Sequence, residues 1–387
     1  MERSPVLASG SGAPLALRWI TNPGYDLLWY IAPALVSYLL LYLNLGLGID
    51  YAILWWVWTL GFDGPHVFGT INRTYLDREE WRTRGPLLRR ALLWFLPGPL
   101  LVFASAMGGT KLPYFGFLLF ANLWAYWHVV RQHYGFLTLY QRKNGEPAGL
   151  QNRVDYWAFY LLMCLPFVAF LIQNEMARQL LHELGLPLQP STFEAQLLRG
   201  ITTVVIGAAV VYLGKELWRL RQGQTLNGPK NLFLFACVPL HLFLCLHPVV
   251  ATKLHPLLFT VLVTLYHNFQ YTGIVWFYNV NRYHRAESAA RFGAAARVAR
   301  TFALYYAFGV GFTLLLRYTH WFCTGNTTGP FMPGPNVISQ TSIGSLFSVT
   351  ELAIAFWWGF AFNHYWLDQK IWRVSKDTRL NQDLKLA

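Results

Sequence analysis

Five histidines lie within long apolar stretches of the chain and are the residues best suited to carry chemistry. They are His66, His128, His133, His267 and His364. Ionisable side chains are costly in apolar segments of membrane-spanning length, so their presence there indicates a functional site. Imidazole nitrogen is a good ligand for iron, zinc and manganese. We therefore interpret these five histidines as candidate metal ligands.

Two carboxylates occur at helical spacing from these histidines. Asp63 precedes His66 by three residues, and Asp368 follows His364 by four. Either spacing places two side chains on one face of a helix. Each carboxylate could be a further ligand, or could orient the histidine beside it. We predict Asp63 and Asp368 as catalytic residues.

His128 and His133 pose a geometric problem because they are five residues apart. That spacing separates two side chains by about 140° around an ideal helix. The two imidazoles can bind one metal ion only if the helix is distorted or the site is broad. The sequence alone leaves open whether His133 contacts the metal.

The histidines must be positioned by membrane helices. Hydrophobic residues make up 55% of the chain and charged residues 13%, about half the charged fraction of a soluble domain. This composition excludes a soluble globule and a disordered chain. We predict an all-α polytopic membrane protein, a single integral membrane domain over residues 1–387. Ten segments have the required length, near 27–46, 52–72, 91–107, 114–140, 155–173, 200–220, 231–250, 254–280, 301–320 and 345–367.

The distribution of Lys and Arg predicts the orientation of these spans. With the N-terminus inside, the inner segments hold 24 of the 31 Lys and Arg residues and the outer segments hold 5. Basic residues concentrate on the cytoplasmic side of membrane proteins. We predict that both termini are cytoplasmic, that the membrane is the bacterial inner membrane, and that the net charge of +13 does not serve nucleic-acid binding. The candidate ligands then lie at the cytoplasmic ends of the second, fourth, eighth and tenth spans.

The four cysteines do not indicate a disulfide framework or a zinc cluster. Cys164, Cys237 and Cys245 all fall inside apolar segments. His241 lies mid-span in the seventh segment, and we interpret it as a hydrogen-bonding residue between helices.

Polar and aromatic residues near the candidate ligands suggest a substrate pocket. The predicted pocket residues are Tyr126, Arg131, Asn268, Gln270 and Asn363, with walls formed by Tyr126, Trp127, Tyr271, Trp357 and Trp358.

Two segments resemble a known family. Gly64-Pro65-His66, followed two helices later by Trp127-His128 and a further His133, is similar to the Brp/Blh family of membrane β-carotene-cleaving dioxygenases. The resemblance covers about thirty residues, and it implies iron bound by His66, His128 and His133. The chain departs from the family at Val67, where the family has glycine. The spacing of His128 and His133 also resembles the first histidine box of membrane fatty-acid hydroxylases and desaturases, but no His-x-x-His-His box is present.

These observations lead to one preferred function and to alternatives. The preferred function is a non-haem iron oxygenase that acts on an apolar lipid or isoprenoid from the surrounding membrane and that could draw on an electron donor. The alternatives are a zinc-dependent lipid hydrolase, similar to the membrane ceramidase and adiponectin-receptor group, and a non-enzymatic transporter or bis-histidine haem protein. A metal assay separates them, because iron, zinc and haem are distinguishable in the purified protein.

Overall fold

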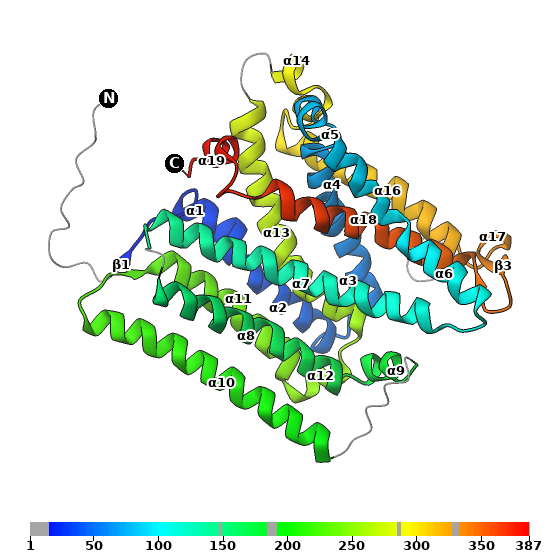
Figure 1. Ribbon diagram of the computed structural model, residues 1–387, viewed down its shortest axis with the longest axis horizontal. Coiled ribbons are helices and arrows are strands. Elements are labelled where there is room, and N and C mark those ends of the chain that lie inside the picture. Colours follow the sequence, from blue (N-terminus) through cyan, green and yellow to red (C-terminus); the bar gives the residue numbers. More distant parts are fainter. Residues whose placement is uncertain (1–14, 147–148, 184–191, 285–287, 327–332, 387) are drawn as a thin grey trace.

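The computed structural model describes residues 15–146, 149–183, 192–284, 288–326 and 333–386. It consists almost entirely of helices (Figure 1), so the predicted all-α class is confirmed. The helices up to residue 173 are α1 (Pro23–Asp26), η1 (Leu27–Ile31), α2 (Pro33–Leu45), α3 (Tyr51–Trp58), η2 (Thr59–Asp63), α4 (Gly64–Arg73), α5 (Arg78–Ala91), η3 (Leu92–Phe95), α6 (Pro97–Met107), α7 (Leu112–Lys143) and α8 (Leu150–Gln173). The later helices are α9 (Glu175–Glu183), α10 (Thr192–Arg221), α11 (Gly228–Leu246), α12 (Pro248–Lys253), α13 (Pro256–Tyr283), α14 (Ser288–Phe292), α15 (Ala294–Val298), α16 (Phe302–Thr324), α17 (Val337–Gln340), α18 (Val349–Ile371) and α19 (Thr378–Asp383).

Two small sheets accompany the helices. The first is a parallel pair and the second an antiparallel pair. Their strands are β1 (Leu15–Ala16), β2 (Leu226–Asn227), β3 (Ser342–Ile343) and β4 (Phe347–Ser348).

Five helical segments in the described part of the chain are long and apolar enough to cross a membrane. They are Pro23–Leu45, Arg78–Met107, Leu150–Gln173, Thr192–Arg221 and Gly228–Leu246. The long helices α7, α13 and α18 fall outside this set, and they carry histidines and other polar residues that lower their hydropathy. Ten spans and two cytoplasmic termini stay predictions.

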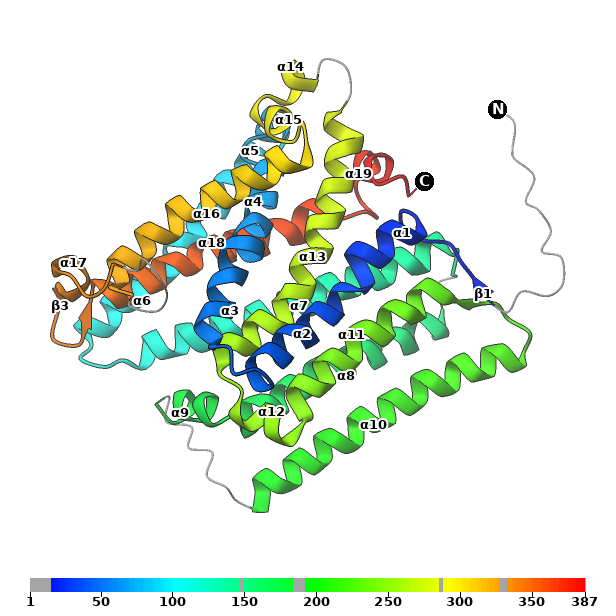
Figure 2. The same ribbon diagram turned by 180° about the vertical axis from the view of Figure 1, so that it is seen from behind.

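Helix α13 runs through the middle of the molecule. In Figures 1 and 2, helices α2, α8, α10 and α11 lie on one side of it, α4, α5, α16 and α18 lie on the other, and the long helix α7 runs across it. Helix α13 packs on α2, α3, α4 and α7, while α16 and α18 pack on each other and on α4. Four of these helices, α4, α7, α13 and α18, therefore meet at the centre of the fold.

The helices that carry the candidate ligands begin with local sequence signals. Pro256 opens α13, and the His255 side chain before it accepts the backbone N–H of Leu257. Ser348 and Glu351 form a capping box at the start of α18. Both devices satisfy backbone N–H groups that a helix N-terminus leaves free.

The entry into α4 is a π-helical turn, η2, that ends at Asp63. Pro65 has no N–H, so the carbonyl four residues earlier, on Gly61, loses its helical partner. The hydroxyl of Tyr306 on α16 donates to that carbonyl instead. A side chain from a neighbouring helix thus stabilises the distorted turn directly before His66.

Close helix contact also fixes the position of α4. An added Cβ on Gly64 would lie 1.8 Å from Oγ1 of Thr313 on α16. Only glycine leaves room for this approach, which is typical of helix packing through small residues in membranes. Helix α4, and His66 with it, is consequently pressed against α16.

Candidate metal centre

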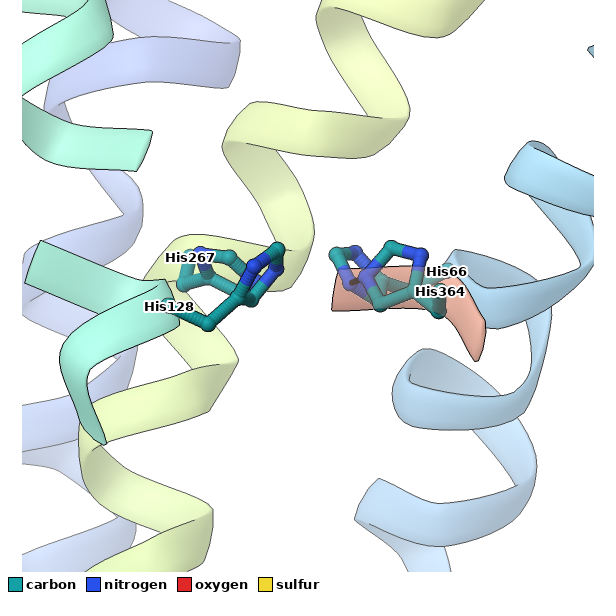
Figure 3. A group of neighbouring side chains, drawn as sticks. All are labelled: His66, His128, His267 and His364. Atoms are coloured by element: carbon teal, nitrogen blue, oxygen red, sulfur yellow. Dashed lines mark hydrogen bonds between the residues drawn. The ribbon is translucent and has the colours of Figure 1, made fainter. Parts of the chain in front are cut away.

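Four of the five predicted histidines converge at the centre of the fold. His66 comes from α4, His128 from α7, His267 from α13 and His364 from α18, and all four side chains are buried. One ring nitrogen from each lies within 4.8 Å of the corresponding nitrogen of every other member. Figure 3 shows the four rings, which we call the histidine quartet, gathered from four separate helices. Residues about 300 positions apart in sequence are thereby brought together.

The quartet is compact enough to surround one metal ion. Nε2 of His66 lies 2.7 Å from Nε2 of His364. The ring centroids of His66 and His267 are 4.7 Å apart, and those of His128 and His364 are 4.9 Å apart. Nitrogen ligands at 2.0–2.1 Å from a tetrahedral ion are about 3.3 Å from one another. The separations within the quartet, 2.7 Å for one pair and under 4.8 Å for the others, bracket that value.

A hydrogen-bonded chain beneath the His364 ring sets its orientation. The Thr70 hydroxyl donates to Oδ1 of Asp368 at 2.9 Å. The same hydroxyl lies 2.5 Å from the Tyr271 hydroxyl. With its single proton directed to either of these oxygens, it accepts from Nδ1 of His364, 2.7 Å away. His364 therefore carries its proton on Nδ1 and presents an unprotonated Nε2 to the quartet. A histidine that binds metal is commonly held in this way, and the predicted orienting role of Asp368 agrees with the contact.

Three buried nitrogens of the quartet have no hydrogen-bond partner among the described residues. They are Nδ1 of His66, Nε2 of His128 and Nδ1 of His267. A buried polar atom without a partner costs about 1–3 kcal/mol. His66 faces His364 through Nε2 rather than Nδ1, and a cation at the quartet would take one lone pair from each imidazole. The donor atoms of the quartet thus fit a metal ion.

Asp63 lines the same cavity as His66 but forms its ion pair with an arginine. Its carboxylate accepts from Nη2 of Arg317 on α16 at 3.2 Å. Both side chains border the cavity described below. Its partner in the structure is therefore an arginine, not His66.

His133 lies outside the quartet. Nδ1 of His133 is 2.8 Å from Oε1 of Gln270, and its ring neighbours Cys237 and His241 instead. The straight helix α7 explains this placement, because the five-residue step from His128 turns His133 to another face. The sequence prediction grouped His133 with the other four, and the structure assigns it to a second group of potential ligands.

The quartet also differs from prediction in its depth. His128 and His267 lie near the middle of α7 and α13 rather than at their ends. Both helices extend beyond the predicted apolar segments into polar sequence, to Lys143 and Tyr283. The site is accordingly enclosed within the helix bundle.

A cavity of about 470 Å³ borders the quartet. Its volume is within the usual range of small-molecule sites. It extends from the four imidazoles to Met176 and Leu181 on α9 and to Pro256 at the start of α13. Most of its wall is aromatic and aliphatic, with Trp58, Phe167, Phe170, Trp357 and Trp358 among the lining residues. An apolar molecule could lie in this space beside the quartet.

Some of the predicted pocket residues line this cavity and others do not lie there. Tyr126, Asn268, Trp357 and Trp358 are lining residues. The remaining predicted residues have other contacts. Arg131 is exposed and donates to the Tyr160 hydroxyl, and Trp127 is 42% exposed. Asn363 donates to the Tyr75 hydroxyl. Gln270 contacts His133, and Tyr271 donates to Asp368.

Thr70 and Arg317 belong to the site but were missed in the sequence. Thr70 follows His66 by four residues, so a search at helical spacing for hydroxyls as well as carboxylates would have found it. No local pattern connects Arg317 with Asp63, 254 positions away.

Comparison of the chain with protein-family models finds no match, and comparisons with curated proteins and with solved structures find none either. The donor atoms, their orientation and the apolar cavity beside them are the observations on which a function can be proposed.

Proposed function

We propose that this protein is a membrane-embedded, non-haem iron oxygenase whose substrate is a lipid or isoprenoid. One observation carries the proposal: four buried imidazoles converge on one point at the wall of a largely apolar cavity. Iron held by histidines with open coordination positions supplies dioxygen activation in such enzymes. The resemblance of Gly64-Pro65-His66 and Trp127-His128 to the Brp/Blh dioxygenases supports the same reading.

Each residue of the site has a distinct task in this proposal. The quartet holds the iron. Thr70 and Asp368 keep Nε2 of His364 unprotonated and directed at the metal. The apolar cavity excludes water and positions the carbon atoms to be oxidised beside the quartet. The Asp63–Arg317 ion pair supplies a polar anchor in the cavity wall for a hydroxyl or a head group.

A zinc-dependent lipid hydrolase is the second candidate function, and the two carboxylates bear on it differently. A hydrolase needs an aspartate free to take the proton of the metal-bound water. Asp63 is engaged by Arg317. Oδ1 of Asp368 accepts from both Thr70 and Tyr271, whereas its Oδ2 lies 3.6 Å from Nε2 of His364, so only Asp368 could serve a hydrolase. Haem is disfavoured for a steric reason, because four imidazoles within 4.8 Å leave no slot for a macrocycle.

The membrane setting is part of the proposal. We infer a multi-pass protein of the bacterial inner membrane with ten spans and both termini in the cytoplasm. The five apolar helices found by length and composition support membrane insertion. An apolar substrate would then partition into the bilayer and reach the cavity laterally, and a reductant would approach from the cytoplasm if the reaction requires electrons.

Oxygen consumption by the iron-loaded protein tests the proposal. The protein is purified in detergent without oxygen, loaded with Fe(II), and mixed with oxygen and either β-carotene or a bacterial lipid extract. We expect substrate-dependent oxygen uptake that His128→Ala abolishes and that His182→Ala, a change at an exposed histidine on α9, leaves intact. Tight zinc binding with lipid hydrolysis and no oxygen uptake would support the hydrolase instead.

A further inference from the structure

A second group of potential ligands lies beside the quartet. It consists of His133 on α7 and of Cys237 and His241 on α11. All three side chains are completely buried, and one ligand atom from each lies within 4.8 Å of the others. Cys237 and His241 are four residues apart, so they share one face of α11. The ring centroids of His133 and His241 are 5.5 Å apart.

The hydrogen bonds of His133 leave its inner nitrogen unprotonated. Nδ1 of His133 is 2.8 Å from Oε1 of Gln270. The amide of Gln270 is oriented by its Nε2, which donates to the carbonyl of Tyr30. Oε1 is thus the acceptor, and His133 must donate from Nδ1. Its Nε2 carries a lone pair and has no partner among the described residues.

The hydrogen bonds of His241 lead to the same result. The Tyr126 hydroxyl donates to the carbonyl of Met163 at 2.7 Å. Its only proton is used there, so at 3.0 Å it accepts from Nδ1 of His241. Nε2 of His241 is therefore unprotonated, and it too lacks a partner within the described part of the chain.

The thiol of Cys237 cannot satisfy both nitrogens. A thiol has one proton and is a weak donor, so at least one buried lone pair stays unmatched. That deficit costs about 1–3 kcal/mol. A cation that replaces the thiol proton would bind both nitrogens and the sulfur together, with the proton released to solvent.

We propose that His133, Cys237 and His241 form a second metal site, and that its ion is copper(I). Soft thiolate ligands select copper(I) or zinc. In a fully buried site charge decides between them, because an uncompensated buried charge is expensive. Copper(I) with one thiolate and two neutral imidazoles is neutral, whereas zinc leaves one positive charge and the group contains no carboxylate.

This site is independent of the proposed iron centre but adjacent to it. The ring centroids of His133 and His267 are 6.3 Å apart. The quartet offers nitrogen alone, and the second group offers sulfur as well. A sulfur ligand is therefore a signature of the second site, whatever metal occupies the first.

Copper(I) titration of the full-length protein in detergent, in competition with bicinchoninate, tests the proposal. We expect one copper(I) to bind with a sulfur and two nitrogens in its X-ray absorption spectrum. Cys237→Ser should weaken copper(I) binding by at least about tenfold. Loss of a residue that only supports a ligand already costs about 10–100-fold in metal affinity, and Cys237 is proposed as a ligand itself. Cys323→Ser is the control, because Cys323 lies on α16 and outside the group.

Three results would overturn the proposal. Copper(I) bound without sulfur in the wild-type spectrum would exclude Cys237 as a ligand, a test that does not depend on how any variant folds. Equal copper(I) affinity in Cys237→Ser and Cys323→Ser would do the same. Zinc that displaces copper(I) from a sulfur-containing site would refute the choice of metal. None of these results bears on oxygen uptake by the iron-loaded quartet.

Discussion

Replacing Thr70 by valine removes one buried hydroxyl and keeps the shape of the side chain. In the structure this hydroxyl accepts from Nδ1 of His364 at 2.7 Å and donates to Asp368 at 2.9 Å. Without it, the Nδ1 proton of His364 has no fixed acceptor. The imidazole can then rotate, or move its proton to Nε2, where it blocks metal binding. We therefore expect Thr70→Val to weaken iron binding without removing any ligand.

The expected magnitude follows from the role of Thr70 behind a ligand. Changes to such partners typically reduce metal affinity 10–100-fold, or about 1.4–2.8 kcal/mol at 1.4 kcal/mol per factor of ten. The assay is Fe(II) competition against a chelating dye under nitrogen. Thr70→Ser, which keeps the hydroxyl, should restore most of the affinity.

Thr59→Val is the matched control for this experiment. Thr59 is as buried as Thr70, and its hydroxyl has no partner among the described residues. We expect wild-type iron affinity in Thr59→Val. Wild-type affinity in Thr70→Val, or an equal loss in the two variants, would refute the proposed orientation of His364.

Two further predictions concern stability. Lys230 is fully buried, with Nζ 3.0 Å from both Glu146 and Asp155, so Lys230→Met should destabilise the fold by about 3 kcal/mol in detergent unfolding. Arg291→Met removes an ion pair with Glu79 in which the arginine is 60% exposed, so it should cost under about 1 kcal/mol. A larger loss of stability in Arg291→Met than in Lys230→Met would contradict this account of the buried charges. Gly64→Ala places a Cβ 1.8 Å from Thr313 and should cost about 1–3 kcal/mol of stability. Gly61→Ala is the control, because its Cβ meets nothing within 4 Å. Equal melting temperatures for the two variants would show that α4 and α16 are not in close contact.

The quartet could be predicted from the sequence because its signal is local. Each of His66, His128, His267 and His364 is an ionisable residue in an apolar segment, and such segments must become helices. The spacing of His364 and Asp368 also placed a carboxylate on the correct face. The separation of His128 from His133 followed from helix geometry alone, although the histidines were still grouped together.

Other features depend on contacts between distant segments and have no local signature. The pairing of Asp63 with Arg317, and of the Gly61 carbonyl with Tyr306, joins residues about 250 positions apart. Cys237 was set aside because it lies in an apolar segment. Its four-residue spacing to His241 was visible, but the approach of α7 that adds His133 was not.

The metal content of the purified protein tests the central claim most directly. Wild type, His128→Ala and His241→Ala are each purified without oxygen, loaded with Fe(II), desalted and analysed by mass spectrometry of the metal. We expect about one iron per chain in wild type and in His241→Ala, and almost none in His128→Ala. Of the two substituted histidines, only His128 belongs to the quartet, and water cannot replace a lost imidazole ligand at similar affinity. Equal iron in the two variants would contradict the assignment of the quartet as the iron centre.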